Sequence, residues 1–539
     1  MNNENMETKR SDKFLSALEA AKNGDADAQF TLGVMYIEGE ETEQNYAEAY
    51  KYYKLAAKQG NVNAQINLGN MYYYGVGVKQ NYLKAVEYYT VAAAQGEAIA
   101  QWSLGSMYYY GTGVEQDFNK SLEYYQLAAQ QDNSDAQFNI GCMYRDGHGV
   151  AQDYAKAAEY FQQASFKGHS DAQYNLGVLY ENGLGIKKDY TQAYKYYDLA
   201  AKQGNSDAQI NLGLLYEDGI GVKQNYKKAV EFYSAAAEQG NAIGQYHLAG
   251  MYFAGKGVEQ NYNKCIEYYQ LAAEQNLVDA QFNLGAIYDK GKITHPNYTE
   301  AMKYYLLATK GGSYEASYNL GLMLYEGKGV EQDYINAAKY FHFAAQGRLA
   351  PAEYILGLMY YQGMGIGKNY EKAAEYFQLA AAQGEAVAQT QLGGFYENGI
   401  YFKQDDMKAF EYYQLAADQG EVIAQYQLAY FYQIGKGVKQ NDAKALEYYQ
   451  LAAAQGDIDA LLDLGKKYFS GNGVKQNYLK AVEYFQQAAN QDNAESQYIL
   501  GLMYLNGYGV KENKRMAKDF FGKSCKNGNQ KACEIYNQI

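Results

Sequence analysis

Asparagine amides and aromatic rings recur along the chain at multiples of 36 residues. An amide can donate and accept hydrogen bonds along an extended peptide main chain, and an aromatic ring offers a flat apolar contact. The pattern therefore predicts a ladder of binding residues for a segment of a partner protein. The residues of this predicted ladder are Asn67, Trp102, Asn139, Tyr174, Asn175, Asn211, Glu217, Tyr246, Asn283, Tyr318 and Asn319.

Both kinds of residue have a structural alternative. Large rings at helical spacing also fill space between successive helices, and this packing is the interpretation that we favour for the aromatic residues. For the asparagines we favour ligand contact, because asparagine is a poor interior helix former and the sequence offers no structural reason for its recurrence.

Carboxylates stand close to these positions and would make such a surface acidic. An acidic surface lined with amides would prefer a polar or basic partner segment, whereas the alternative is that the carboxylates are solvated surface groups. They are Asp146, Glu181, Glu217, Asp218, Asp289, Glu326 and Glu397.

The sequence predicts no catalytic residues, no metal site and no cofactor. None of these carboxylates is accompanied by a histidine or cysteine suited to acid–base work, and the five histidines follow no metal-ligand spacing. The recurring Gly-x-Gly elements lack the Lys-Ser/Thr ending of a phosphate-binding loop. We therefore expect a protein that is not an enzyme and has no small-molecule substrate.

Composition excludes several classes of partner. The formal net charge is −14, and no run of lysine and arginine could neutralise a phosphate backbone, so nucleic acid is not expected as a partner. The sequence contains no stretch of about 18 apolar residues, so membrane insertion is not expected. The first residues are polar and lack the apolar core of a secretory signal, which predicts a cytoplasmic location, with export as an effector left open.

A repeat of 36 residues organises the chain and would position these side chains. Fourteen copies without insertion or deletion run from Ala28 to Lys531, and we number positions within a copy from zero at its leading residue. Apolar residues at positions 0, 4 and 8 predict a first helix, helix A. Glycine at position 11 ends helix A in all fourteen copies, and asparagine or aspartate at position 17 predicts the N-cap of a second helix, helix B.

The sequence predicts four segments around this array. Residues 1–10 are expected to form a disordered leader and residues 11–27 an N-terminal capping helix. The fourteen repeats over residues 28–531 are expected to form one all-α solenoid, and residues 532–539 a truncated C-terminal capping helix.

The repeat pattern A-Q-x-N-L-G-x-x-Y-x-x-G-x-G-V-x-Q-N-Y-x-K-A-x-E-Y-Y-x-x-A-A-x-Q-G resembles the Sel-one-like repeat (SLR) family, a relative of the tetratricopeptide repeat. The resemblance implies a right-handed α/α superhelix in which one side of helix A lines a concave groove. It also implies a scaffold or adaptor for protein complexes, in bacteria often in signalling or host contact, without catalytic residues.

Cys525 and Cys533 carry a second, local resemblance. The segment SCKNGNQKAC is similar to the repeats of cysteine-rich bacterial SLR proteins, where such pairs are bridged. Here the pair occurs once, so both a disulfide and two reduced thiols in a capping turn remain open.

Three functions follow from this reasoning. The first is a scaffold whose groove binds one or more proteins or peptide segments. The alternative is a solenoid that binds cell-wall or other glycans by stacking sugars on aromatic rings. The last is a hydrolase of the cysteine-rich SLR type, for which the sequence shows no nucleophile with its base.

Overall fold

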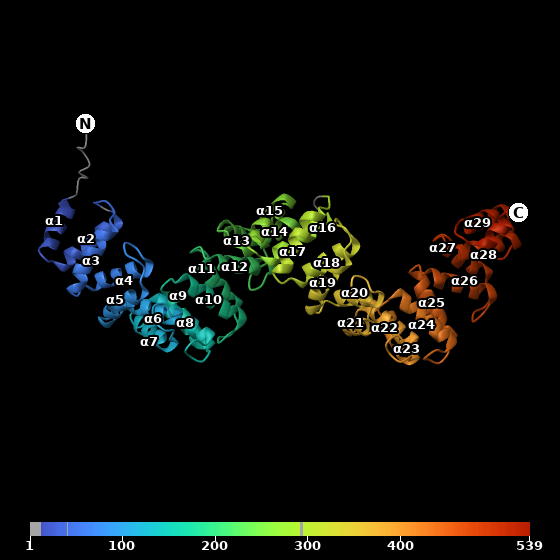
Figure 1. Ribbon diagram of the computed structural model, residues 1–539, viewed down its shortest axis with the longest axis horizontal. Coiled ribbons are helices and arrows are strands. Elements are labelled where there is room, and N and C mark those ends of the chain that lie inside the picture. Colours follow the sequence, from blue (N-terminus) through green and yellow to red (C-terminus); the bar gives the residue numbers. More distant parts are fainter. Residues whose placement is uncertain (1–11, 40, 292–294) are drawn as a thin grey trace, which may run out of the picture. The chain divides into compact units, whose positions relative to one another are not determined.

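The structure is a computed structural model that describes residues 12–39, 41–291 and 295–539. The expected leader, residues 1–10, lies outside the described residues. The chain divides into two compact units, residues 1–275 and 276–539. Within each unit the helices follow one another in sequence order (Figure 1). Over the described residues the secondary structure is entirely helical, as the sequence predicts.

The first unit contains α1 and the helices of the first seven repeats. Even-numbered helices are A helices and odd-numbered helices from α3 onward are B helices. The helices are α1 (Asp12–Lys22), α2 (Ala26–Glu38), α3 (Tyr46–Lys58), α4 (Val62–Tyr74), α5 (Tyr82–Ala94), α6 (Ala98–Tyr110), α7 (Phe118–Ala129), α8 (Ser134–Asp146), α9 (Tyr154–Phe166), α10 (Ser170–Asn182), α11 (Tyr190–Ala201), α12 (Ser206–Asp218), α13 (Tyr226–Glu238), α14 (Ala242–Ala254) and α15 (Tyr262–Glu274).

The second unit contains the other seven repeats and a final short helix. The helices are α16 (Val278–Lys290), α17 (Tyr298–Lys310), α18 (Tyr314–Glu326), α19 (Tyr334–Gln346), α20 (Ala350–Gln362), α21 (Tyr370–Ala382), α22 (Ala386–Asn398), α23 (Asp406–Asp418), α24 (Val422–Ile434), α25 (Asp442–Ala454), α26 (Ile458–Ser470), α27 (Tyr478–Ala489), α28 (Ala494–Asn506), α29 (Lys514–Lys526) and α30 (Gln530–Tyr536). No helix among the described residues is long and apolar enough to cross a lipid bilayer.

The residues at positions 11 and 17 set the helix ends as predicted. Gly219 ends α12 with a φ of 72°, a left-handed conformation that glycine adopts without strain. Asn225 then caps α13, because its side chain accepts a hydrogen bond from the Lys228 amide at 3.2 Å. The same two devices recur in all fourteen repeats.

Several helix boundaries differ from those expected. A helices begin two residues before the leading residue, because a residue at position −3 caps them: the Asn205 side chain accepts from the Ala208 amide at 2.9 Å. For the same reason α1 ends at Lys22, since Asp25 already caps α2. Helix α30 starts at Gln530 because Asn529 caps it.

The core of each repeat is the contact between its own two helices. Glycine at position 5 lies under the aromatic ring at position 25: a Cβ atom on Gly69 would lie 2.5 Å from the Tyr89 ring. On the other side, rings at positions 8 and 24 stack, as Tyr72 and Tyr88 do with centroids 5.7 Å apart. The glycine therefore permits the close approach of helix B, and the aromatic residues fill the space above it.

A ladder of buried amides links the ends of each repeat. The Gln239 side chain at position 31 donates to Oε1 of Gln209 at position 1 over 2.8 Å, and Gln209 donates in turn to the Ala201 carbonyl. Nine repeats have such an amide pair, and in a tenth Gln383 donates to Glu353. Because buried polar atoms need partners, this ladder allows glutamine at position 1 to lie in the core.

Candidate functional site

The tyrosine at position 25 organises the part of helix A where the predicted site lies. The Tyr197 hydroxyl donates to Oε2 of Glu181, at position 9 of the same repeat, over 2.5 Å. The Asn211 amide, at position 3 of the next repeat, lies beside the same hydroxyl and favours its ionised form. Burial and the Glu181 carboxylate raise the pKa of Tyr197, so the hydroxyl keeps its proton at any physiological pH.

The same contact recurs for other predicted asparagines. Asn67 lies beside the Tyr53 hydroxyl and Asn319 beside the Tyr305 hydroxyl, each across the boundary between two repeats. Burial raises the pKa of Tyr53 to about 12, and the neighbouring Asn67 amide works against that rise. The tyrosine contact thus supplies a structural reason for the recurrence of asparagine, which the sequence did not reveal. Binding of a partner by these amides stays a prediction.

Asn175 has a different partner because the preceding repeat has Phe161 at position 25. Nη1 of Arg145 donates to Oδ1 of Asn175 over 2.6 Å, and Nδ2 of Asn175 donates to the Asp171 carbonyl over 2.8 Å. The predicted Asn139 and Asn283 are half-buried, as are the other four asparagines.

The predicted aromatic residues pack against their own helix B, whereas the sequence suggested packing between successive A helices. Tyr174 lies 5.9 Å from the Tyr197 ring, and Tyr246 and Tyr318 lie 5.6 and 5.9 Å from the rings at position 25 of their repeats. All three are half-buried. Trp102 joins the cluster around Tyr125, and its buried Nε1 donor has no hydrogen-bond partner among the described residues.

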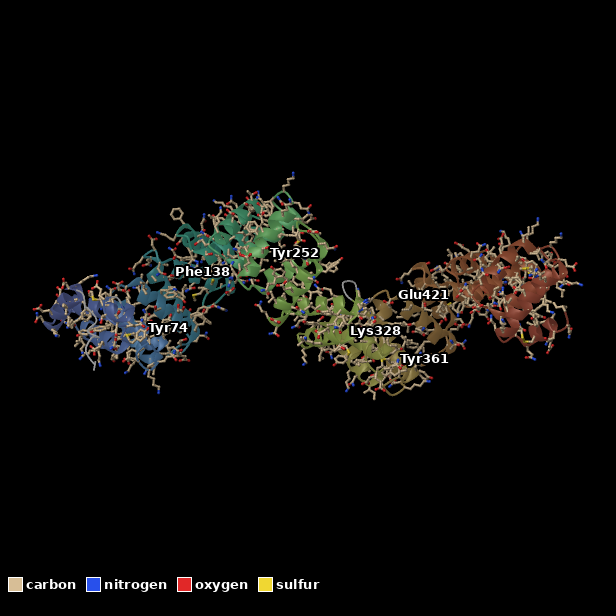
Figure 2. The ribbon with its side chains drawn as sticks, turned by 90° about the horizontal axis from the view of Figure 1, so that it is seen from above. Tyr74, Phe138, Tyr252, Lys328, Tyr361 and Glu421 are labelled. Carbon is tan, nitrogen blue, oxygen red and sulfur yellow. A yellow bond between two sulfur atoms is a disulfide. The ribbon has the colours of Figure 1, made fainter. Side chains whose placement is uncertain are left out.

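The carboxylates at position 9 are partly compensated by lysines at position 12 of the next repeat. Glu217 accepts from the Tyr233 hydroxyl at 2.9 Å and lies 3.7 Å from Lys256. Two further pairs of this kind join Asp289 to Lys328 (2.7 Å; Lys328 is labelled in Figure 2) and Glu397 to Lys436 (2.8 Å). These acids therefore hold the repeats together as well as charging the surface.

Two tyrosines at position 10 extend the predicted site, although reasoning from the sequence did not include them. Tyr74 and Tyr110 are 69% and 72% exposed (Tyr74 is labelled in Figure 2). Burial together with the neighbouring Tyr74, Tyr82 and Tyr110 raises the pKa of Tyr73, so rings from two successive repeats adjoin there. The available signal was that position 10 is a tyrosine only in these two repeats.

A cavity of about 210 Å³ lies beside Tyr74 and is lined by Tyr53, Asn67, Asn70 and Met71 among others. It places one predicted asparagine next to one exposed ring. We call the surface formed by Asn67, Asn70, Tyr73, Tyr74 and Tyr110 the tyrosine surface. Among the described residues no group of three or more His, Cys, Asp or Glu side chains could hold a metal ion.

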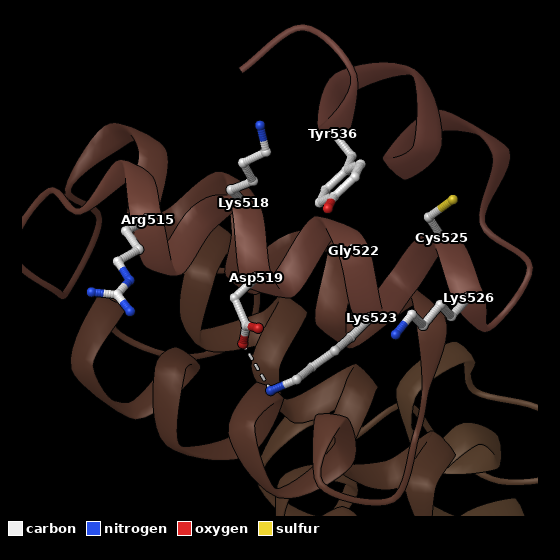
Figure 3. Close-up of a pocket in the computed structure, with 8 residues that line it drawn as sticks. All are labelled: Arg515, Lys518, Asp519, Gly522, Lys523, Cys525, Lys526 and Tyr536. Carbon is white, nitrogen blue, oxygen red and sulfur yellow. Dashed lines mark ion pairs between the residues drawn. The ribbon is translucent and has the colours of Figure 1, made fainter.

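The cysteine pair forms a disulfide between α29 and α30. Cys525 and Cys533 are bridged, with Cα atoms 4.7 Å apart. Beside it lies a cavity of about 510 Å³ whose lining includes Lys518, Cys525 and Tyr536, which are labelled in Figure 3. The Lys518 ammonium lies 5.3 Å from the centre of the Tyr536 ring. The bridge and this contact tie the final helix to the last full repeat.

Comparisons with known proteins agree with this architecture. The model of the Sel1 repeat matches fourteen times between residues 26 and 529. A solved structure of a protective antigen of uropathogenic Escherichia coli strains, with an SLR fold, is 30% identical; the alignment covers 89% of this chain and 95% of that chain, with a TM-score of 0.63. A Sel1 repeat protein from Oxalobacter formigenes is 29% identical over 57% of this chain and 90% of its own, with a TM-score of 0.49. A search of curated proteins finds no match. The chain belongs to the Sel1 repeat family.

Proposed function

We propose that the protein is a non-enzymatic scaffold that binds a segment of a partner protein on the tyrosine surface. Sel1 repeat proteins generally act as interaction scaffolds. The observation that carries the proposal is the exposure of Tyr74 and Tyr110, 69% and 72%, on successive repeats beside the cavity that contains Asn67. Exposed tyrosines are frequent anchors of protein interfaces, because the ring gives apolar area and the hydroxyl a hydrogen bond.

The distribution of charge along the repeats suggests the orientation in which the proposed partner segment would bind. The second and third repeats present the tyrosine surface, whereas the later repeats of the first unit present Asp146, Glu181, Glu217 and Asp218 near the same end of helix A. An apolar portion of the segment would contact the tyrosines, and a polar or basic portion would contact the acids. The amides of Asn67 and Asn70 would bond to the main chain of the segment.

A photo-crosslinking experiment tests this proposal. p-Benzoylphenylalanine replaces Tyr74 or Tyr110, and as a control it replaces Leu83, which is 67% exposed on α5. We expect both tyrosine positions to crosslink the same protein segment from cell lysate, and Leu83 not to do so. The purified segment should then bind the wild-type protein and lose most of its affinity for the Tyr74→Ala, Tyr110→Ala double variant.

Other outcomes would replace the proposal. Crosslinks that form equally at Leu83 would show that the tyrosine surface is not special. Retention of the protein on a glycan column, lost in the double variant, would favour the glycan-binding alternative, since sugars also stack on tyrosine rings.

The location of the protein is also a proposal. The cytoplasmic location expected from the sequence stays a prediction, while the Cys525–Cys533 bridge and the likeness to a protective antigen favour an exported protein with a role in host contact. Trapping free thiols with N-ethylmaleimide in intact cells decides between the two, because both cysteines would be alkylated in a reducing cytoplasm.

A further inference from the structure

The buried amide ladder is broken in the repeat that starts at Ala136. Lys167 occupies position 31, where most repeats have glutamine, and its ammonium pairs with Asp132 at 3.0 Å. Gln137 at position 1 is retained and only 3% exposed. Its Oε1 atom is buried and has no hydrogen-bond partner among the described residues.

An unsatisfied buried acceptor is costly, about 1–3 kcal/mol. Another repeat shows how the cost is avoided when position 31 loses its amide. In the repeat that starts at Ala316, Gly347 stands at position 31, and position 1 is Ser317, whose hydroxyl donates to the Tyr340 carbonyl over 2.8 Å. In the repeat from Ala136 only one partner has changed, so the buried Gln137 acceptor is left without its amide donor.

A cavity of about 600 Å³ lies at this break, and Gln137, Lys167, Asp132, Glu159 and Phe166 are among its lining residues. Phe166 at position 30 is 89% exposed. No other repeat has an aromatic or large apolar residue at position 30; they have lysine, alanine, glutamine, glutamate, aspartate or asparagine. The Glu159 carboxylate forms no ion pair with a described residue, whereas that of Asp132 is engaged by Lys167.

We propose that this cavity binds an arginine side chain of a partner protein. A guanidinium can lie flat on the Phe166 ring while its N–H groups donate to Oε1 of Gln137 and to the Glu159 carboxylate. A lysine ammonium lacks the flat surface and the fork of donors. An anion would face two carboxylates and an acceptor without a free cation, because Lys167 is already paired.

The arginine site is separate from the tyrosine surface. It is formed by positions 1, 23, 26, 27, 30 and 31 of one repeat, together with Asp132, near the end of helix B and away from positions 3, 6, 9 and 10 of helix A. The two proposals therefore stand or fall independently.

Saturation-transfer difference NMR on the full chain tests the proposal, because it detects weak ligands of large proteins. The probe is N-acetyl-arginine amide, and the neutral N-acetyl-citrulline amide is the control ligand. Lys167→Gln restores the residue that completes the ladder in most repeats and should close the site without harm to the fold. Phe166→Lys introduces the residue found at position 30 in Lys58 and Lys202, and Lys202→Ala is the matched control variant.

We expect transfer to the arginine side-chain protons in the wild type and in Lys202→Ala, and a signal weaker by about tenfold in Phe166→Lys and Lys167→Gln. Lys167→Gln should also melt at the same temperature as the wild type or above it. Absence of transfer in the wild type, equal transfer in Lys167→Gln, or equal transfer to the citrulline probe would each overturn the proposal.

Discussion

Replacing Glu353 by glutamine should stabilise the second unit. Glu353 occupies position 1 and is 3% exposed, and it accepts a hydrogen bond from Gln383 at 2.6 Å. Burial raises the pKa of this carboxyl, which means that the fold disfavours its charged form. A carboxylate also cannot donate to the Ala345 carbonyl in the way that Gln389 donates to the Ala381 carbonyl over 3.3 Å.

The expected gain is about 1–2 kcal/mol at pH 7. One new hydrogen bond contributes about 1 kcal/mol, and removal of a buried charge adds to it. The sign of the pH dependence follows from the raised pKa in the fold. Below pH 4.5, the pKa of the carboxyl in the unfolded chain, the carboxyl is protonated in both the folded and the unfolded states, so no charge has to be buried. As the pH rises past 4.5 the unfolded state loses this proton more readily than the folded state, and the wild type loses stability. The advantage of Glu353→Gln should therefore shrink towards pH 4.

Amide hydrogen exchange is the suitable assay, because a solenoid opens locally and its stability is a sum over neighbouring repeats. Peptides from α20 and α21 should exchange more slowly in Glu353→Gln at pH 7, by roughly the factor of 5–30 that 1–2 kcal/mol corresponds to. The reciprocal control is Gln389→Glu, which should speed exchange in α22 and α23. Unchanged exchange in Glu353→Gln, or a gain that grows towards pH 4, would refute the reasoning.

Three further substitutions test the parts of the repeat. Asn225→Ala removes the cap of α13 and should destabilise that helix by about 1 kcal/mol, which would be measured as faster amide exchange in α13. Unchanged exchange would mean that packing alone fixes the helix start. Gly69→Ala places a Cβ atom 2.5 Å from the Tyr89 ring and should cost about 1–3 kcal/mol, seen as a lower melting temperature; an unchanged one would show that the ring can move aside. Cys525→Ser should release α30, so that its amides exchange within seconds to minutes as in a frayed end, whereas retained protection would show that the bridge is dispensable.

Local signals made the helices predictable. Gly219 and Asn225 act on the backbone within a few residues of themselves, so their meaning could be inferred without knowing the tertiary structure. The starts of the A helices were placed two residues late, because the cap is a different residue type in different repeats: Asn205 in one, His169 in another and Leu277, without a side-chain bond, in a third. A variable cap leaves no regular pattern to recognise.

The hydroxyl contacts of the candidate site were not predictable in the same way. Glu181, Tyr197 and Asn211 come from three helices and two repeats, and their spacing in the sequence does not say that their side chains meet. Asparagine at position 3 was therefore assigned to a ligand, although in three repeats it lies beside the hydroxyl of a buried tyrosine. The recurrence of tyrosine at position 25 and glutamate at position 9 was a usable signal only once the angle between helices A and B was known.

Repeats within one chain provide the comparison that identifies functional departures. When both members of a contact change together, as at Ser317 and Gly347, the replacement satisfies its own polar groups and indicates only drift. At Lys167 and Gln137 one member has changed and the other remains, and the fold bears an unpaired buried atom where nine sister repeats place a second amide. We therefore attribute the unpaired acceptor beside an exposed phenylalanine to the proposed ligand, which would complete the contact.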